Sequence, residues 1–527
     1  MCVLASAATE PPVKHIGPAV YHLSLILVLV VLRCPPVTGE QAAVPANAHV
    51  PVEELRLANG MTLLLVPQPE STTVAVGWMV DAGSADDDSD QTGLSHLLEH
   101  MMFKGSRTVG TRDLELELEA LAAVDRAWTA KKDLLAKMEQ ASPKKRQKLS
   151  PRLDAASSLL ATAQARASSL AFLGQYSFLY SQQGGTGLNA NTYRDLTLYY
   201  VTLPSEKIEL WFWLESDRLL APVFREFYKE VQIIHEERRQ RIESTPSGPL
   251  DEQLRVSFWG PHPYAWNPLG RAADLDTISR QHALDFFQRN YRPDKMTAVL
   301  VGGFDAWQVE TWARQYFGRL PAPSKPGPES PRQPLEERTK ERRLEATCNC
   351  PPQVQILYPT ARFGDPDADA LQLLSAVLNG RTGRLYRSLV LDQQIAFSAF
   401  TQQISWKQKG EFSLRAESKG SVDPAELIRA WDQQIDLLGT EAPTPQEIQR
   451  AQNRSIADAY RSLKDPTALM KQLLIYQGLG DWRYVNQWSG RLQELSSDDL
   501  VRVAAKYLVP DKRTVAIYRR PQEQATP

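Results

Sequence analysis

Alternating stretches of apolar and polar residues predict β structure followed by α structure at the start of the folded chain. Residues 61–66 and 72–80 are rich in Val, Leu and Thr. Pro67 and Pro69 separate them, which is typical of two strands joined by a turn. Residues 93–103 follow with apolar positions at helical spacing. We therefore expect a sheet whose second strand leads into a helix.

A long polar segment then predicts a helical hairpin. Residues 112–140 and 151–173 are rich in Ala, Leu, Lys, Glu and Arg, and they are interrupted at Ser142-Pro143 and Ser150-Pro151. We interpret residues 112–173 as a hairpin inserted into the first domain. Charged helices of this kind are usually solvated, which favours a projecting insertion. A partner-binding arm is the alternative.

A proline-rich linker and a repeated turn divide the chain into comparable halves. Residues 321–334 contain six Pro in fourteen positions, which excludes a helix or the interior of a sheet. Residues 291–297 (YRPDKMT) and 507–514 (YLVPDKRT) each precede an apolar strand. The alternative is that a common type of turn occurs twice by coincidence. The two segments are separated by about the length of a domain, however, which favours tandem duplication.

The duplication predicts an α+β fold of two homologous domains. Each is expected to pack helices on an antiparallel or mixed β-sheet, with the hairpin inserted in the first. We expect an N-terminal segment to residue 40, a first domain over 50–320, a linker over 321–337 and a second domain over 338–522.

The N-terminal segment predicts export. Residues 23–32 are apolar except for Ser24, Lys14 precedes them and Arg33 follows. Ten helical residues span about 15 Å, too short for a hydrocarbon core of about 30 Å. The segment is therefore typical of a secretory signal peptide. An uncleaved membrane anchor is the alternative.

The net charge limits the kinds of partner that we expect, and the cysteine content limits the disulfides. Lys and Arg number 60 against 62 Asp and Glu, for a net charge of −2. This balance argues against nucleic acid or an anionic membrane surface as the main partner. Membrane contact is expected only through the N-terminal segment, if that segment is uncleaved. Removal of a leader leaves only Cys348 and Cys350. Because one residue between them would strain a mutual disulfide, we expect both to be structural or incidental, with a free thiol possible.

Residues 93–105 (GLSHLLEHMMFKG) carry the main candidate for chemistry. His96 and His100 are four residues apart, so on a helix their imidazoles share one face and can reach one metal ion. Neutral imidazole nitrogen suits zinc. Glu99 is adjacent to His100, from where its carboxylate can take a proton from a metal-bound water. Two core or surface histidines beside a solvated Glu are the alternative.

A zinc site needs a third ligand, and residues 226–243 supply candidates on what looks like one helix. Glu230 and Glu237 are seven residues apart and therefore share a face. Glu236 points about 100° away, towards solvent. His235 is an alternative ligand that cannot face the metal together with Glu237. Spacing alone favours the Glu230/Glu237 face only modestly over a row of surface acids.

These residues and their surroundings resemble the inverted zinc metallopeptidases of the pitrilysin/insulinase family. In that family the catalytic Glu directly precedes the second His, as in His96-Leu97-Leu98-Glu99-His100. Further likeness extends through most of the chain and is strongest to half-length bacterial members similar to the mitochondrial processing peptidase β subunit. The segments that carry it are residues 189–193 (NANTY), 214–218 (LESDR), 235–239 (HEERR), 262–264 (HPY) and 379–381 (NGR).

The resemblance implies a zinc-dependent endopeptidase with one Zn²⁺ per chain. It implies His96, His100 and Glu237 as ligands, Glu99 as the general base that activates a zinc-bound water, and Glu230 as an outer acid that supports the site.

The resemblance also implies how a peptide or unfolded protein segment binds. The substrate would extend along an edge strand and form main-chain hydrogen bonds with it. The expected substrate-binding residues are Gly185, Asn189, Ala190 and Asn191.

The chain departs from the family pattern in three places. The interval from His100 to Glu237 is long, and the hairpin accounts for the excess. The second half lacks the His-containing motif and would be structural. An Arg and a Tyr that many relatives use for transition-state stabilisation cannot be assigned, although Arg415 lies in a predicted strand. A homodimer or a heterodimer with a homologous subunit lacking the motif is therefore expected.

The family resemblance places the protein in the bacterial periplasm, or anchored in the membrane and facing it. Two other functions remain open. One is a catalytically weak or inactive zinc-binding assembly subunit, against which the intact Glu99 argues, since assembly needs no base. The other is a binding module in which the hairpin recruits a partner and the metal is purely structural.

Overall fold

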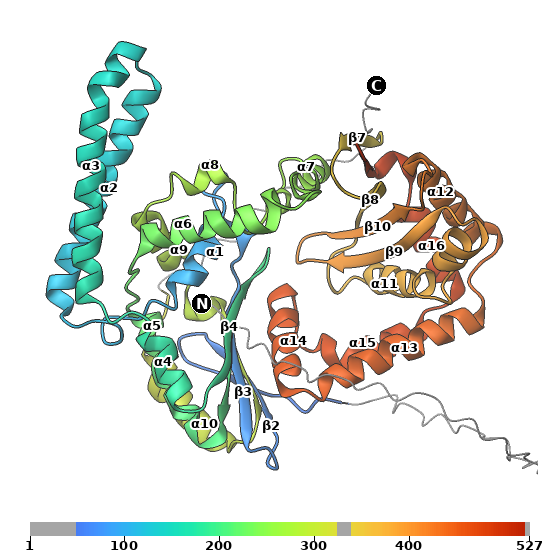
Figure 1. Ribbon diagram of the computed structural model, residues 1–527. Helices are drawn as coiled ribbons and strands as arrows, with labels where there is room; N and C mark the ends of the chain where they lie inside the picture. The colour runs from blue at the N-terminus through green and yellow to red at the C-terminus, as the bar shows by residue number, and fades with distance from the viewer. Residues whose placement is uncertain (1–48, 324–338, 522–527) are drawn as a thin grey trace, which may run out of the picture. The chain divides into compact units, whose positions relative to one another are not determined.

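A computed structural model describes residues 49–323 and 339–521 of the chain (Figure 1). The predicted N-terminal leader and nearly all of the predicted linker lie outside these residues. All of the described residues belong to one compact unit. Within them, no helix is both long enough and apolar enough to cross a bilayer.

The first half is built on a mixed sheet of six strands in the order β1-β2-β6-β3-β5-β4. Only β2 and β6 pair in parallel. The strand β4 occupies one edge, so one side of its backbone is available for further pairing. The strands are β1 (Glu53–Arg56), β2 (Thr62–Pro67), β3 (Thr73–Val80), β4 (Thr186–Thr192), β5 (Thr197–Pro204) and β6 (Met296–Gly302).

The second half repeats this arrangement in a sheet of five strands in the order β7-β11-β8-β10-β9. In both sheets a parallel pair at one side, β2/β6 or β7/β11, is followed by three antiparallel pairings. The two halves are therefore homologous domains, as the repeat predicted. The strands are β7 (Arg342–Thr347), β8 (Gln353–Thr360), β9 (Ala396–Ser405), β10 (Gly410–Ser418) and β11 (Thr514–Arg519).

The repeated sequence occupies the same place in each half. Pro293–Lys295 and Pro510–Lys512 each form a single 3₁₀ turn. Each turn follows a helix and leads into the strand that lies between the parallel and antiparallel parts of its sheet, β6 or β11. A shared turn at equivalent positions agrees with duplication and not with coincidence.

Helices of the first half cover one face of its sheet and supply the candidate site. They are α1 (Leu94–Met101), α2 (Leu114–Glu139), α3 (Pro143–Leu170), α4 (Gln175–Gln182), α5 (Ile208–Leu220), α6 (Phe227–Arg238), α7 (Gly248–Trp259), α8 (Ala272–Leu275), α9 (Arg280–Asn290) and α10 (Ala306–Tyr316). Those of the second half are α11 (Pro366–Leu378), α12 (Pro424–Thr440), α13 (Pro445–Leu463), α14 (Pro466–Leu479), α15 (Tyr484–Glu494) and α16 (Ser497–Tyr507).

The first sheet is buried on both faces, which explains the continuous apolar character of β6. On one face, Val76, Trp78 and Leu300 pack with helices of the first half. On the other face, Val299 and Val301 pack with α14 and the start of α15 from the second half. Because side chains alternate along a strand, every residue of β6 is covered.

The predicted hairpin is present as α2 and α3, which Figure 1 shows extending away from the sheet. Ser142-Pro143 separates the helices as expected. Pro151, in contrast, lies inside α3 and does not break it. Leu149 and Leu160 are buried on either side of Pro151, and packing on α2 keeps the chain helical despite the lost hydrogen bond.

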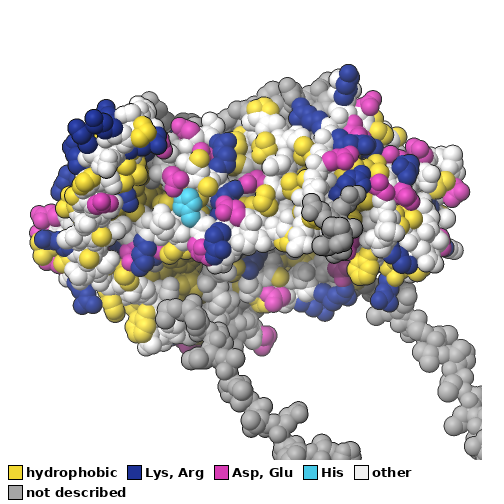
Figure 2. Space-filling view, turned by 45° about the horizontal axis from the view of Figure 1, so that its top comes forward, with side chains coloured by type: hydrophobic (Ala, Val, Ile, Leu, Met, Phe, Trp, Pro, Cys, Tyr) yellow, Lys and Arg dark blue, Asp and Glu magenta, His cyan; other side chains and the backbone are white. Residues whose placement is uncertain are grey.

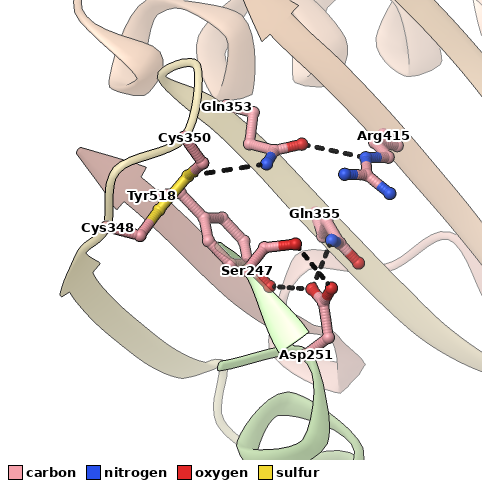
Figure 3. Close-up of a disulfide and its surroundings, with 8 residues drawn as sticks. All are labelled: Ser247, Asp251, Cys348, Cys350, Gln353, Gln355, Arg415 and Tyr518. Carbon is pink, nitrogen blue, oxygen red and sulfur yellow. Dashed lines mark hydrogen bonds between the residues drawn. A yellow bond between two sulfur atoms is a disulfide. The ribbon is translucent and has the colours of Figure 1, made fainter. Parts of the chain in front are cut away.

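The expectation that strain disfavours a mutual disulfide is wrong, because Cys348 and Cys350 form one between β7 and β8 (Figure 3). Their Cα atoms are 5.2 Å apart, within the usual range for disulfides. Both residues are buried in an apolar cluster that includes Phe258 of α7 and Tyr518 of β11. The disulfide therefore lies where a helix of the first half packs on the sheet of the second.

Candidate metal centre

The short helix α1 presents the motif residues at the centre of the first half. Leu94, Leu97, Leu98 and Met101 are fully buried, which fixes the rotation of the helix about its axis. That rotation turns His96, Glu99 and His100 towards one cavity. The two imidazole rings are 4.8 Å apart between centroids, as expected for positions one helical turn apart.

The helix α6 brings the acidic residues to the same place. Its buried apolar residues, among them Phe227, Val231 and Ile234, hold it against the core of the first half. Glu230 and Glu237 consequently both face the histidines. The predicted helix over 226–243 ends earlier as an α-helix, at Arg238, and continues as a single π turn, Arg239–Glu243.

His96, His100 and Glu237 converge with the chemistry and spacing of a metal site. A carboxylate oxygen of Glu237 lies 3.9 Å from Nε2 of His96 and 3.8 Å from Nε2 of His100. The three ligand atoms lie within 4.8 Å of one another. Ligands of a tetrahedral zinc ion lie about 3.4 Å apart. Two imidazole nitrogens and one carboxylate oxygen therefore fit zinc, with a fourth position left open.

The other side of His100 is held by Glu230. Nδ1 of His100 lies 3.2 Å from Oε2 of Glu230, and Lys104 donates to Oε1 of the same carboxylate at 2.5 Å. Despite its burial, these two partners lower the pKa of Glu230. A partner on Nδ1 leaves Nε2 free to bind a metal, which is the arrangement typical of zinc-binding histidines.

The environments of the two histidines differ. Burial, with His100 and Arg241 nearby, lowers the pKa of His96 to about 3, so its imidazole is neutral and able to bind a metal. Burial acts in the same direction on His100, but the hydrogen bond to Glu230 and the charge of Glu99 outweigh it and raise its pKa. A metal ion would therefore compete with a proton more strongly at His100 than at His96.

Glu99 lies beside the three candidate ligands and is not part of the group that they form. It is buried, and its Oε2 accepts a hydrogen bond of 2.5 Å from Oγ1 of Thr192 at the end of β4. Burial raises the pKa of Glu99, although Thr192 and His100 act against this. A carboxylate made more basic by its surroundings is suited to accept a proton from a substrate water.

The cavity joins these residues to the edge strand of the sheet. It has a volume of about 460 Å³ and is lined by His96, Glu99, His100 and Glu237 together with Asn189, Ala190 and Asn191 of β4. A peptide paired with the free edge of β4 would therefore pass the candidate metal centre.

Gly185 does not join the other predicted substrate-binding residues. It precedes β4 and does not line the cavity. A Cβ atom there would lie 2.8 Å from the carbonyl oxygen of Tyr180. Glycine is therefore needed at this position for the close approach of α4 to the strand.

The two alternatives on α6 lie elsewhere. Glu236 is exposed and pairs with Arg239 and Gln240. Nε2 of His235 lies 3.1 Å from Asp276.

Sequence reasoning missed two residues of the site. Thr192 contacts the carboxylate of Glu99, and Arg241 pairs with Oε1 of Glu237 at 2.9 Å. Arg241 also lines the cavity. The spacing of four residues between Glu237 and Arg241 was a usable signal for the ion pair. No local pattern indicates the contact of Thr192, because it joins residues 93 positions apart.

Comparison with known families identifies both halves. Residues 62–146 match the family "Insulinase (Peptidase family M16)", and residues 277–455 match "Peptidase M16 inactive domain". The chain belongs to the M16 family of peptidases. This bears out the resemblance seen in the motif. The "inactive domain" description falls largely on the half that lacks the His96/His100 motif.

Individual M16 proteins are similar over most of their length. Zinc protease PqqE of Helicobacter pylori is 21% identical over 91% of this chain and 95% of its own. The mitochondrial-processing peptidase subunit beta of Lentinula edodes is 22% identical over 86% of each chain. The solved structure of a protease from Helicobacter pylori covers 89% of this chain and 100% of its own, with a TM-score of 0.73 at 19% identity. The last likeness bears out the expected fold.

Proposed function

We propose that this M16 chain is a zinc-dependent endopeptidase that cleaves peptides or unfolded protein segments. The proposal rests on one observation above all. His96, His100 and Glu237 converge in a cavity that also holds Glu99 and borders the free edge of β4. The names of similar proteins, zinc protease and processing peptidase, support the same chemistry.

In the proposed mechanism each residue has one task. His96, His100 and Glu237 would hold one zinc ion, and Glu230 would orient His100. A zinc ion supplies Lewis acidity that makes water a stronger nucleophile and polarises a peptide carbonyl. Glu99 accepts the proton of the attacking water and returns it to the leaving amine. Thr192 holds the Glu99 carboxylate on the β4 side of the cavity.

The edge of β4 is the proposed substrate-binding element. Asn189, Ala190 and Asn191 would pair by their main chain with an extended substrate. Main-chain pairing tolerates many sequences, so we propose broad specificity limited by access to the cavity. Nε of Arg415 donates a hydrogen bond to Gln353 on the second sheet, and Arg415 does not line the candidate cavity. The transition-state Arg and Tyr of other family members therefore stay unassigned in this chain. We therefore keep the proposal of a homodimer, or of a heterodimer with a homologous subunit that lacks the motif.

Export is part of the proposal and rests on the apolar N-terminal residues 23–32. An inactive assembly subunit is the competing function, because one half of the chain matches a domain described as inactive. The two functions differ in whether Glu99 is needed.

Replacement of Glu99 tests the mechanism. Glu99→Gln should keep one zinc per chain and lose at least about 10²-fold in kcat, since a positioned base contributes about 10²–10⁴-fold. Glu237→Gln should lose zinc as well as activity. Glu236→Gln is the matched control, because this exposed neighbour is expected to change neither quantity. The measurements are metal content by mass spectrometry and cleavage of an unstructured peptide.

Two outcomes would contradict the proposal. Cleavage that persists in Glu99→Gln rules out Glu99 as the base. Zinc content that is unchanged in Glu237→Gln rules out Glu237 as the third ligand. A wild-type protein that binds zinc but cleaves no peptide, alone or with its co-purifying partner, supports the assembly subunit.

A further inference from the structure

The far end of the α2–α3 hairpin concentrates positive charge in a chain that is otherwise balanced. Residues 137–152 contain six Lys or Arg and a single acid, Glu139, whereas the whole chain has a net charge of −2. Figure 2 shows Lys and Arg side chains gathered at the upper left of the molecule, over the hairpin. The local excess is therefore a property of this one element.

Four of these cations form a single face, which we call the basic face: Lys144, Lys145, Lys148 and Arg152. At about 100° per residue they fall within an arc of about 100° and along about 12 Å of α3. All four are exposed, and among the described residues none of them forms an ion pair. Arg146 points elsewhere and donates to the carbonyl oxygens of Met138 and Glu139 at the end of α2.

The basic face lies at the N-terminal end of α3, where the helix dipole disfavours positive charge. The N-terminal end of a helix carries partial positive charge and favours acidic residues. The first turn of α3 instead holds no acid, and its side chains after Pro143 are Lys144, Lys145 and Arg146. A surface helix selected only for stability or solubility does not need a cluster of positive charges in its first turns. Departures from local rules of this kind are typical of functional surfaces.

The fold itself does not use this end of the hairpin. The residues of α2 that are buried in the main core end at Ala127. Beyond them the two helices pack chiefly on each other, through Ala141 and Leu149. Figure 1 shows this part of the hairpin extending past the surrounding helices. The basic face is thus carried at a distance from the candidate metal centre and is open to a large partner.

The chemistry of the face favours a lipid surface over other polyanions. Residues 129–171 contain no aromatic residue, so bases of a nucleic acid would find no stacking platform. Leu135, and Leu159 two turns after Arg152 on α3, are the large apolar side chains exposed on this part of the hairpin, too few for the central apolar anchor of a protein interface. The proposed leader, with its apolar residues 23–32, would independently bring the chain to a membrane, during export or permanently.

We propose that the basic face of α3 docks on an anionic phospholipid surface. Its four cations would lie against lipid phosphates without insertion of the hairpin into the hydrocarbon. Such contacts depend on the fraction of anionic lipid and weaken with salt. This adds a second membrane contact to the one expected from the N-terminal segment, and it does not depend on the proposed peptidase activity.

The test compares binding of the full-length protein to two kinds of vesicle, phosphatidylcholine alone and phosphatidylcholine mixed with phosphatidylglycerol. The quantity measured is the ratio of the two partition constants, in which insertion of the N-terminal segment cancels. Each cation near an anionic surface raises partition roughly fivefold. The variant Lys144→Gln, Lys145→Gln, Lys148→Gln, Arg152→Gln should therefore lower the ratio at least about tenfold.

Two further variants separate charge from structure. The control Arg450→Gln, Arg454→Gln, Arg461→Gln, Lys464→Gln removes the same charge from exposed positions in or just after α13 and should leave the ratio unchanged. Replacement of Lys144, Lys145 and Lys148 by Arg keeps the charge and should preserve binding. Equal helix content by circular dichroism shows that all variants are folded.

Several results would overturn the proposal. One is an equal ratio for the wild type and the basic-face variant. Another is an equal loss in the α13 control, which means that net charge and not this face governs binding. A third is a basic face that is needed for binding duplex DNA or polyaspartate but not for vesicles, which assigns the face to a soluble polyanion.

Discussion

At the residue scale, the buried carboxylates of this chain differ in how fully their surroundings compensate their negative charge. Glu215 accepts hydrogen bonds from Trp78, Tyr176 and Tyr180 and pairs with the buried Arg218. These partners compensate its charge, and loss of Glu215 would leave Arg218 buried without a counter-charge. The negative charge of Asp195 is compensated less fully. It accepts from the hydroxyl of Tyr264 at 2.6 Å and from the backbone N–H of Lys407 at 3.1 Å.

Asp195 should therefore make stability depend on pH. Burial raises its pKa from 3.8 to about 6, against the hydrogen bonds from Tyr264 and Lys407. Between about pH 4 and 6 the carboxyl ionises in the unfolded chain but stays protonated in the folded one, so its stabilising contribution falls as pH rises. The loss amounts to about 3 kcal/mol. Urea unfolding across this range should show a shallower fall for Asp195→Asn, and parallel profiles would contradict the assignment.

Some residues of the candidate site can be predicted from the sequence more readily than others. The pair His96 and His100 could be recognised because both lie on one short helix, where spacing fixes geometry. Glu230 and Glu237 could be placed on one face for the same reason. Their common target could not be deduced from spacing, since the approach of α6 to α1 is set by packing between distant segments. Thr192 escaped prediction for that reason as well.

At the element scale, the base of the inserted hairpin is bound tightly to the segment that carries the two acidic residues of the candidate metal centre. Arg225, just before α6, pairs with Glu117 of α2 while both are almost fully buried. Arg225 also donates to the carbonyl oxygens of Lys104 and Ser106, which follow α1. Trp128 of α2 stacks on Tyr228 of α6. The hairpin is thus part of the framework that fixes α1 and α6 relative to each other.

Loss of one partner of this buried pair should be costly. Glu117→Gln leaves the Arg225 guanidinium buried without a counter-charge and should lower the free energy of unfolding by about 3–5 kcal/mol. Glu119→Gln, an exposed change of the same kind on the same helix, should cost little. Chemical denaturation of the two variants measures the difference. Equal stabilities would show that the pair does not contribute.

The type of most elements could be predicted, but not every boundary. Alternation and proline positions indicated β2 and β3 to within a residue or two. The sequence predicts a helix break at Pro151 because the rule for proline is local, whereas the burial of Leu149 and Leu160 depends on packing between helices. The disulfide was missed for a related reason. A spacing of two residues states how far apart the cysteines are in sequence, but not that a turn between two strands brings them together.

At the scale of the whole molecule, the halves are joined by a shared apolar core. Leu469, Met470, Leu473 and Leu474 of α14 pack on the sheet of the first half. Gly77 of β3 allows this close approach, since a Cβ atom there would lie 2.8 Å from the sulfur of Met470. On the other side, Asp251 of α7 accepts hydrogen bonds from Gln355 and Tyr518 of the second sheet (Figure 3).

A substitution in the second half should therefore destabilise the first. Leu473→Ala opens a cavity against the first sheet and should cost about 2–5 kcal/mol. Leu437→Ala, on the partly exposed face of α12, is the control and should cost much less. Hydrogen exchange of β3 and β6 should rise in the Leu473 variant. If protection is lost only in the second half, the shared core does not stabilise the sheet.

The linker and the repeated turn were enough to predict two homologous domains, and the order of strands in the two sheets agrees with this. They could not predict that α14 covers the first sheet. The apolar run of β6 indicates that both faces are buried, but it carries no information about which segment buries them.

The covering of the first sheet by α14 also matters during synthesis of the protein. Well over a hundred residues separate the end of β6 from the start of α14. At about 5–20 residues per second, the ribosome needs on the order of ten to thirty seconds to make them. Throughout that interval the nascent first half has a complete set of strands with one apolar face uncovered. A holding chaperone is therefore expected to bind the emerging chain at this face and to be displaced when α14 arrives.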